Sequence, residues 1–307
     1  MQKLEESEQF FREYGLPFFR QEFPEIFPRL AFGLAGRGSE CFGFDDDVSK
    51  DHDFLRRFFI WIDEKDEPAW GFLLQKAYLG LLREHPAEQG GDSLLGEMEH
   101  GVMTIRRFYE LRSGLPDIPE SWQQWLYTPE YAFAEAVNGK VFEDYYGEFS
   151  RIRQGIREGM LPDVRLKKLA ARLVEMAQNG QYNYMRCHAH KEDGAAGIML
   201  AGFVTSCIQT VFLLNAEYCP YAKWMFRAMR NLPLLAELAD PLEFLLNDPA
   251  PHKEKAALIE DICTQIIKEL IRRDLSAARG NYLENHAFEV MKKIRNPQIR
   301  SLHVMEG

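Results

Sequence analysis

The sequence has few cysteines and no C-x-x-C pair among its 307 residues. The five cysteines are far apart in the chain: Cys41, Cys187, Cys207, Cys219 and Cys263. The N-terminal stretch "MQKLEESEQFF" lacks the pattern of a signal peptide, and there is no internal repeat and no low-complexity segment. We therefore expect reduced thiols and a cytoplasmic location.

Positive charge is also scarce, because 37 lysines and arginines face 47 acidic residues and the net charge is -10. A surface of this sign repels the phosphate backbone of nucleic acids. We expect no stable nucleic-acid binding, although a local basic groove stays open as an alternative.

Only one uncharged run, residues 194–215, is long enough to cross a bilayer. It carries polar side chains at Thr205, Ser206, Gln209 and Thr210, and it has no strongly basic flank. These features favour a buried helix over 194–214 at the centre of a soluble bundle, and no membrane association. A membrane span is the alternative.

The first third of the chain alternates between helical and strand patterns. Residues 4–15 are typical of an amphipathic helix, and "LAFGLAG" (30–36) of a short buried strand. The aromatic and β-branched stretch at 51–63 predicts a second strand, and 68–83 a helix with proline in its first turn. A third strand is expected within 100–111.

Beyond residue 119 the pattern is almost entirely helical, with loops expected at Asn138-Gly139, Asn179-Gly180, Pro220 and Pro249 to Pro251. The sequence therefore predicts an α+β protein: a small mixed-sheet domain over 1–118, followed by an all-α helical bundle over 119–307.

The stretch "GRGSECFGFDDDVSKDHDF" (36–54) contains five aspartates within nine residues. Carboxylates this close repel one another, so a divalent cation is the expected partner. An EF-hand is excluded, because its sixth and twelfth positions would be Lys50 and Arg56 instead of glycine and glutamate. A solvated acidic loop is the simpler alternative.

Two of these aspartates, Asp51 and Asp53, open the predicted second strand. Side chains two apart on a strand point to the same face, so this pair can bridge two metal ions. Gly38 and Ser39 fit the same chemistry, because glycine allows close approach to a phosphate and serine adds a hydroxyl donor.

Gly38-Ser39 followed after eleven residues by Asp51-His52-Asp53 resembles the signature of the polymerase-beta-like nucleotidyltransferase superfamily. The stretches "NGKVFEDYYGEFSRIR", "MAQNGQYNYMRC" and "FLLNAEYCPYAKW" extend the resemblance to an uncharacterised bacterial family in which a helical domain follows the catalytic one. It covers about Gly33 to Leu235.

The resemblance implies an enzyme that binds an NTP, ATP being the expected one, between its two domains. With Mg²⁺ or Mn²⁺ held by Asp51 and Asp53, it would move an NMP group to a hydroxyl of a small molecule or a protein. Gly38 and Ser39 would hold phosphate. The acceptor and the oligomeric state stay open.

The superfamily usually supplies a third carboxylate from a later strand, and the expected positions 102–104 carry none. The nearby candidates are Asp63, Glu97, Glu99 and Glu110. Candidates for the general base are Glu143, Asp144 and Glu148. If no third acid reaches the site, the alternative is a catalytically weak or inactive nucleotide-binding or interaction module.

The helical half offers cations for the triphosphate, namely Arg186 and Lys223, of which the lysine is implied by related nucleotidyltransferases. Two further motifs are weaker. His188-Ala-His190 could bind metal but shows no third ligand. Arg279 and His286 have the R-x6-H spacing of RNA-cleaving helical domains.

Overall fold

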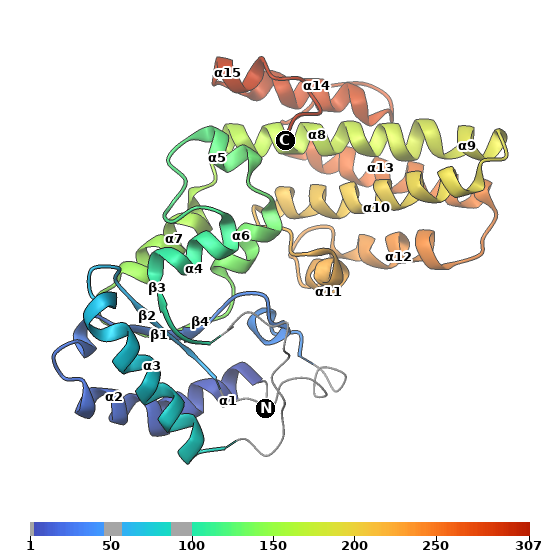
Figure 1. Cartoon of the computed structure of the whole chain (residues 1–307). Helices are drawn as coiled ribbons and strands as arrows, with labels where there is room; N and C mark the ends of the chain where they lie inside the picture. Colours follow the sequence, from blue (N-terminus) through green and yellow to red (C-terminus); the bar gives the residue numbers. More distant parts are fainter. Residues whose placement is uncertain (1–2, 46–56, 87–99) are drawn as a thin grey trace. The chain divides into compact units, whose positions relative to one another are not determined.

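The computed structural model describes residues 3–45, 57–86 and 100–307 (Figure 1). The chain divides into two compact units. Unit 1 comprises Met1–Glu120 and Tyr131–Gly159, and unit 2 comprises Ser121–Glu130 and Met160–Gly307.

The sheet of unit 1 has four strands in the order β3-β2-β1-β4. Their bounds are β1 Ala31–Leu34, β2 Phe59–Ile62, β3 Gly101–Thr104 and β4 Lys140–Asp144. β1 runs antiparallel to β2 and to β4, whereas β2 and β3 are parallel. The mixed sheet confirms the predicted α+β class.

Helical segments cover both faces of this sheet (Figure 1). The helical segments of unit 1 are α1 (Lys3–Phe10), the π-helical η1 (Phe11–Gly15), α2 (Leu16–Glu22), η2 (Phe27–Arg29), η3 (Ser39–Phe42), α3 (Glu67–Glu84), α4 (Ile105–Ser113), α6 (Glu130–Val137) and α7 (Glu148–Gly159). Trp61 stacks on Phe149 of α7 at 3.6 Å between ring centroids. Phe58, immediately before β2, packs against Phe11 on the other face. Because β2 is buried on both sides, its residues "FIWI" are all apolar.

The strand predicted within 100–111 is short: β3 ends at Thr104, whose hydroxyl accepts a hydrogen bond from the backbone N–H of Arg107 and caps α4. The described part of the predicted strand at 51–63 contains β2, which covers only Phe59–Ile62. The predicted domain boundary between 118 and 119 differs from the observed division. β4 lies inside the segment expected to be all-helical, and its pairing with β1 joins residues 131–159 to unit 1.

Unit 2 is helical throughout its described elements. They are α5 (Trp122–Tyr127), α8 (Pro162–Met176), the π-helical η5 (Ala177–Tyr184), α9 (Met185–Ala189), α10 (Asp193–Asn215), η6 (Ala222–Trp224), α11 (Met225–Met229), η7 (Ala236–Leu238), α12 (Ala239–Asn247), α13 (His252–Arg272), α14 (Leu283–Lys293) and α15 (Pro297–Arg300). α8 packs against α10 and α14.

The uncharged run forms α10, as predicted. By length and composition this helix could cross a membrane, but 61% of its most apolar window is buried inside the protein. Cys207 and Val211 are fully buried, whereas Ile198 is 69% exposed. α10 therefore has a core side and a solvent side, as expected for the central helix of a bundle.

The loop predicted at Asn179-Gly180 is wrong, because η5 continues the helical path from α8 into α9. Gly180 is required there for packing: a Cβ atom would lie 2.4 Å from the ring of Phe203 on α10. The backbone widens into a π-helical turn instead of breaking.

Candidate functional site

The loop after β1 is built around Gly36, which has a φ of +125° that disfavours any residue with a side chain. The side-chain amide of Asn138 both accepts from the Gly36 N–H at 2.8 Å and donates to its carbonyl at 2.6 Å. Gly139 then donates its N–H to the carbonyl of Cys41 at 2.7 Å. The Asn138-Gly139 turn thus holds the glycine-rich loop in place.

Gly38 packs directly against the carboxylate of Glu40. A Cβ atom at Gly38 would lie 2.3 Å from Glu40 Oε1, so a side chain there would have to displace the Glu40 carboxylate. The Glu40 side chain is itself buried and forms an ion pair with Arg57 at 3.2 Å. Packing against the Glu40–Arg57 pair therefore favours glycine at position 38, whether or not a ligand binds there.

Arginines surround this loop. The guanidinium of Arg112, at the end of α4, lies against Gly36, and Arg37 pairs with Glu135 at 3.4 Å. Arg153 donates to the carbonyls of Asn138 and Gly139 at 3.1 and 2.9 Å. Burial, together with the charge of Arg157, lowers the pKa of Arg153. The lowered pKa reflects a partly buried cation beside a like charge, which a nearby anion would stabilise.

Ser39 begins η3 within this frame, and its hydroxyl makes no hydrogen bond to another residue in the described ranges. The glycines allow close approach to the backbone, and the guanidinium groups of Arg112 and Arg153 lie near the loop, whereas Arg37 and Arg57 are paired with Glu135 and Glu40. Such a loop is suited to bind an anion of phosphate chemistry.

The predicted catalytic pair, Asp51 and Asp53, lies outside the described residues. Gly38 and Ser39 belong to the loop just described. The strand pairing places that loop at one end of the sheet, because the end of β1 pairs with the start of β2: Gly33 faces Phe59. We call this the loop end of the sheet.

Arg186 and Lys223 both belong to unit 2 and are exposed. Each cation lies over a neighbouring aromatic ring, Arg186 over Tyr182 and Lys223 over Trp224, both at 4.8 Å from the ring centre. Neither forms an ion pair with a residue of the described ranges. The contact of Arg186 and Lys223 with a triphosphate stays a prediction.

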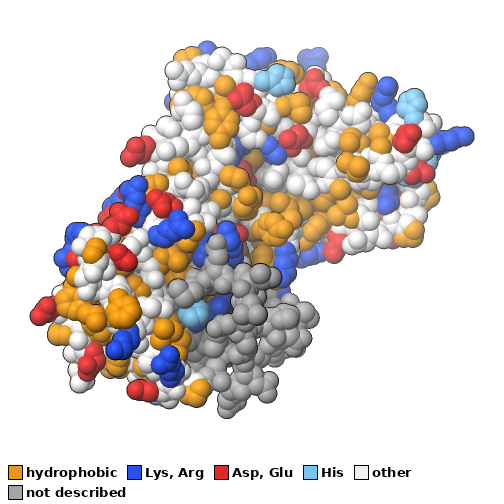
Figure 2. All heavy atoms as spheres, in the orientation of Figure 1, with side chains coloured by type: hydrophobic (Ala, Val, Ile, Leu, Met, Phe, Trp, Pro, Cys, Tyr) orange, Lys and Arg blue, Asp and Glu red, His pale blue; other side chains and the backbone are white. Residues whose placement is uncertain are grey.

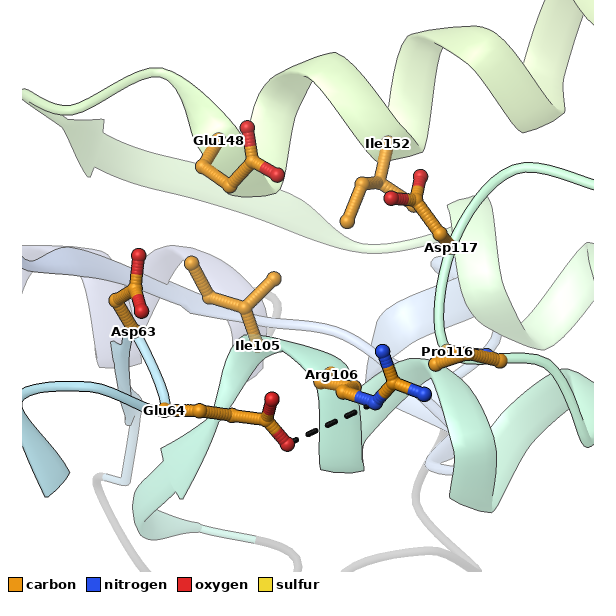
Figure 3. A pocket seen from close by; sticks show the side chains of 8 residues that line it. All are labelled: Asp63, Glu64, Ile105, Arg106, Pro116, Asp117, Glu148 and Ile152. Carbon is orange, nitrogen blue, oxygen red and sulfur yellow. Dashed lines mark ion pairs between the residues drawn. The ribbon is translucent and has the colours of Figure 1, made fainter.

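A pocket of about 150 Å³ lies at the opposite end of the sheet (Figure 3). Its lining residues are Asp63, Glu64, Ile105, Arg106, Pro116, Asp117, Glu148 and Ile152. Burial raises the pKa of Asp63, but hydrogen bonds from Lys65 outweigh it and leave that pKa lowered. Because Asp63 follows β2 and Gly38 follows the antiparallel β1, Asp63 is at the wrong end of the sheet to serve as a third carboxylate for the loop.

The other acidic candidates have structural partners. Glu143 forms an ion pair with Arg12, and Asp144 accepts the backbone N–H groups of Gly147 and Ser150. Glu148 pairs with Arg151 at 2.8 Å. β4 ends at Asp144 beside Ala31, at the opposite end of the sheet from the glycine loop, so none of these three acids lies beside Ser39.

Glu110 also has structural partners, Arg106 at 3.4 Å and Arg107 at 3.9 Å. Glu97 and Glu99 fall outside the described residues. Positions 102–104, which carry no acid, do lie on a strand, since Val102, Met103 and Thr104 belong to β3. Asp63 is therefore excluded as the third carboxylate by its end of the sheet, and Glu110 is engaged by Arg106 and Arg107.

The R-x6-H hypothesis fails at His286. This side chain is fully buried, its Nδ1 bonds the Ser276 hydroxyl at 2.8 Å and its Nε2 bonds the carbonyl of Gly280 at 3.1 Å. Both ring nitrogens are engaged in the core of unit 2. His286 therefore stabilises the turn before α14 and cannot reach a substrate.

Sequence reasoning missed Arg112, Asn138 and Arg153 as parts of the loop. Asn138-Gly139 carries a recognisable turn signal, but nothing in the sequence indicates that this turn packs beside residues 36–41. From the sequence alone, Arg112 and Arg153 are indistinguishable from other cations on the surface of a helix. Only strand pairing brings these segments together.

Comparison with known proteins assigns no role to the residues of the loop. A family model described as a domain of unknown function, DUF4037, matches residues 125–225, a part that includes Arg186 and Lys223 and excludes the glycine loop. The curated proteins contain no match. Among solved structures, the chain is similar to a nucleotidyltransferase-like protein from Exiguobacterium sibiricum 255-15, with 8% identity, a TM-score of 0.37, and coverage of 90% of this chain and 79% of that chain. A likeness at this level does not define the chemistry of this protein.

Proposed function

We propose that this protein is a metal-dependent nucleotidyltransferase that moves an NMP group from an NTP, ATP being the expected one, to a hydroxyl of a small molecule or a protein. The observation that supports it is the loop Gly36 to Glu40: two glycines at which a side chain would be unfavourable, an available serine hydroxyl and nearby arginines at the end of a buried strand. This combination suits the phosphates of a nucleotide.

In this proposal the chain's own groups divide the work. The Ser39 hydroxyl and the loop backbone hold phosphate oxygens. Arg112 and Arg153 make the surrounding potential positive, which stabilises charge on the phosphates as the leaving group departs. Arg186 and Lys223 stay predicted phosphate contacts, since both are exposed cations.

Asp51 and Asp53 are the proposed metal ligands, because paired carboxylates are the donors that Mg²⁺ and Mn²⁺ prefer. Among the described residues, Glu40 fits this role poorly, since Arg57 occupies its carboxylate. When bound, the metal would neutralise the triphosphate and polarise the reacting oxygens. We further propose that the reaction takes place in the cytoplasm.

The test is calorimetric titration of each NTP with and without Mg²⁺, followed by transfer of label from the α-phosphate across a panel of hydroxyl acceptors. We expect magnesium-dependent binding by the unaltered protein. Asp53→Asn should abolish transfer, and Ser39→Ala should weaken binding by about tenfold, the loss of one hydrogen bond to a charged group. Arg186→Ala and Lys223→Ala should each weaken it by about tenfold or more.

Asp63→Asn is the matched control, because it removes one carboxylate from the opposite end of the sheet. It should leave magnesium-dependent binding unchanged. An unaltered protein that binds no NTP at millimolar concentration would contradict the proposal. Binding without transfer to any acceptor would favour the inactive nucleotide-binding module.

A further inference from the structure

Three potential metal ligands meet in unit 2, remote in sequence from the aspartate-rich stretch. His188 Nδ1 lies 3.1 Å from Asp193 Oδ1, and His252 Nε2 lies 4.0 Å from the same oxygen. One ligand atom from each residue lies within 4.8 Å of the other two. The two imidazole rings are stacked, with centroids 3.6 Å apart and planes inclined by 20°.

Local structure sets the spacing of the first two ligands. His188 belongs to α9 and Asp193 begins α10, and the turn between them has Lys191 in the left-handed region with a φ of 62°. Lys191 donates its N–H to the carbonyl of His188, and Glu192 donates to that of Cys187, both at 2.9 Å. These two bonds form a Schellman motif, which fixes the direction in which α10 leaves.

The third ligand is supported from behind. His252 is the first residue of α13, and its Nδ1 lies 2.9 Å from the hydroxyl of Tyr184. Tyr184 is buried, with 1% of its surface exposed. A hydrogen bond at Nδ1 orients the ring and leaves Nε2 for a metal. Metal-binding histidines usually have such a partner on their second nitrogen.

We propose that His188, Asp193 and His252 form a binding site for a divalent transition metal, with Zn²⁺ as the expected ion. Two imidazoles and one carboxylate are donors that suit zinc, whereas Mg²⁺ and Ca²⁺ prefer oxygen ligands throughout. Neighbouring ligand atoms of tetrahedral zinc are about 3.3 Å apart, so the distances are near the required spacing, and the two stacked rings must turn apart for a nitrogen of each to point at one ion. Water takes the fourth position.

The site joins the α9–α10 turn to the start of α13. Figure 2 shows histidine, acidic and basic side chains together at the end of the helical unit where Figure 1 labels α9. The side chains of His188 and His252 are 41% and 36% exposed, so an ion can enter from solvent. The bound ion would tie two helical segments that are about sixty residues apart in the chain and stabilise unit 2.

The experiment uses the full-length protein after chelator treatment and desalting. Co²⁺ is titrated as a spectroscopic probe, and Zn²⁺ affinity is measured by competition with a chelating indicator. The unaltered protein should bind one equivalent. His252→Asn, His188→Asn and Asp193→Asn should each weaken Zn²⁺ binding by about 100-fold or more, and Tyr184→Phe by about tenfold.

The matched control is His190→Asn, which alters an exposed histidine two residues from His188 and outside the cluster. It should keep full affinity, and Zn²⁺ should raise the thermal unfolding midpoint of this control but not of His252→Asn. The double variant Asp51→Asn/Asp53→Asn should also keep zinc binding, which separates this site from the nucleotide site. Absence of one-to-one binding, or equal affinity in His252→Asn and the unaltered protein, overturns the proposal.

Discussion

Asn138 forms two hydrogen bonds with Gly36, a residue 102 positions earlier: its side-chain oxygen accepts from the Gly36 N–H, and its side-chain nitrogen donates to the Gly36 carbonyl. One amide side chain thus satisfies both polar groups of a backbone unit that no strand pairs. Because Gly36 leads directly into Gly38 and Ser39, Asn138 positions the candidate phosphate loop from another part of the fold.

We therefore expect Asn138→Ala to lower the free energy of unfolding by about 1–3 kcal/mol, since it leaves a partly buried donor and acceptor of Gly36 unsatisfied. Asn138→Asp keeps the acceptor and loses the donor, so its free energy of unfolding should lie between that of Asn138→Ala and that of the unaltered protein. Urea unfolding followed by circular dichroism measures both effects. Equal stability of all three proteins would mean that the loop does not depend on this contact.

Gly38→Ala should destabilise the protein by about 1–3 kcal/mol, because its Cβ would meet the Glu40 carboxylate at 2.3 Å and force the Glu40–Arg57 pair apart. Gly80→Ala is the matched control. Gly80 lies within α3 with open space around it, so alanine should stabilise the protein by up to about 1 kcal/mol. Thermal and urea unfolding of the two variants should move in opposite directions.

Helix α10 offers two isoleucines in contrasting surroundings. Ile208 is 1% exposed and Ile198 is 69% exposed. Ile208→Ala should lower the free energy of unfolding by about 2–5 kcal/mol, whereas Ile198→Lys should change it by less than about 0.5 kcal/mol. Both proteins should stay in the supernatant after lysis without detergent. Retention of the unaltered protein in the membrane fraction after a carbonate wash would show instead that α10 enters a bilayer.

Glu269 should make stability depend on pH in the acid range. Hydrogen bonds from Arg272, and then from Arg273, lower the pKa of Glu269 to about 2 in spite of its burial. Since the folded value lies below the ordinary one of about 4.3, this stabilisation is complete above pH ~4.5 and is lost as the pH falls toward 2.

Glu269→Gln should therefore lower the free energy of unfolding by about 1 kcal/mol at pH 7, a value reduced because the Arg272 side chain is 63% exposed. The difference from the unaltered protein should vanish near pH 2. Glu254→Gln, at an exposed position on the same helix, should change stability by less than about 0.5 kcal/mol at either pH. A constant difference for Glu269→Gln at all pH values would contradict the ion-pair explanation.

Much of the local structure could be predicted from the sequence. The apolar run 30–36 contains β1, the helix predicted at 68–83 is α3, and the uncharged run at 194–214 is α10. These predictions succeed because side-chain periodicity and capping residues act over a few neighbouring positions. The prediction at Asn179-Gly180 failed for a tertiary reason, since the glycine serves close packing against Phe203 instead of a turn.

Sequence by itself determined that the chain is α+β, that Gly38 and Ser39 follow a buried strand, and that one apolar helix is central to the second unit. Tertiary structure alone decided that β4 joins the first sheet, that Asn138 lies beside Gly36 with Arg153 bonded to the Asn138-Gly139 turn, and that His252 meets His188 and Asp193. The physical reason is distance along the chain. A residue's conformation is governed largely by its near neighbours, whereas contacts across 60 to 100 residues depend on which buried surfaces fit together.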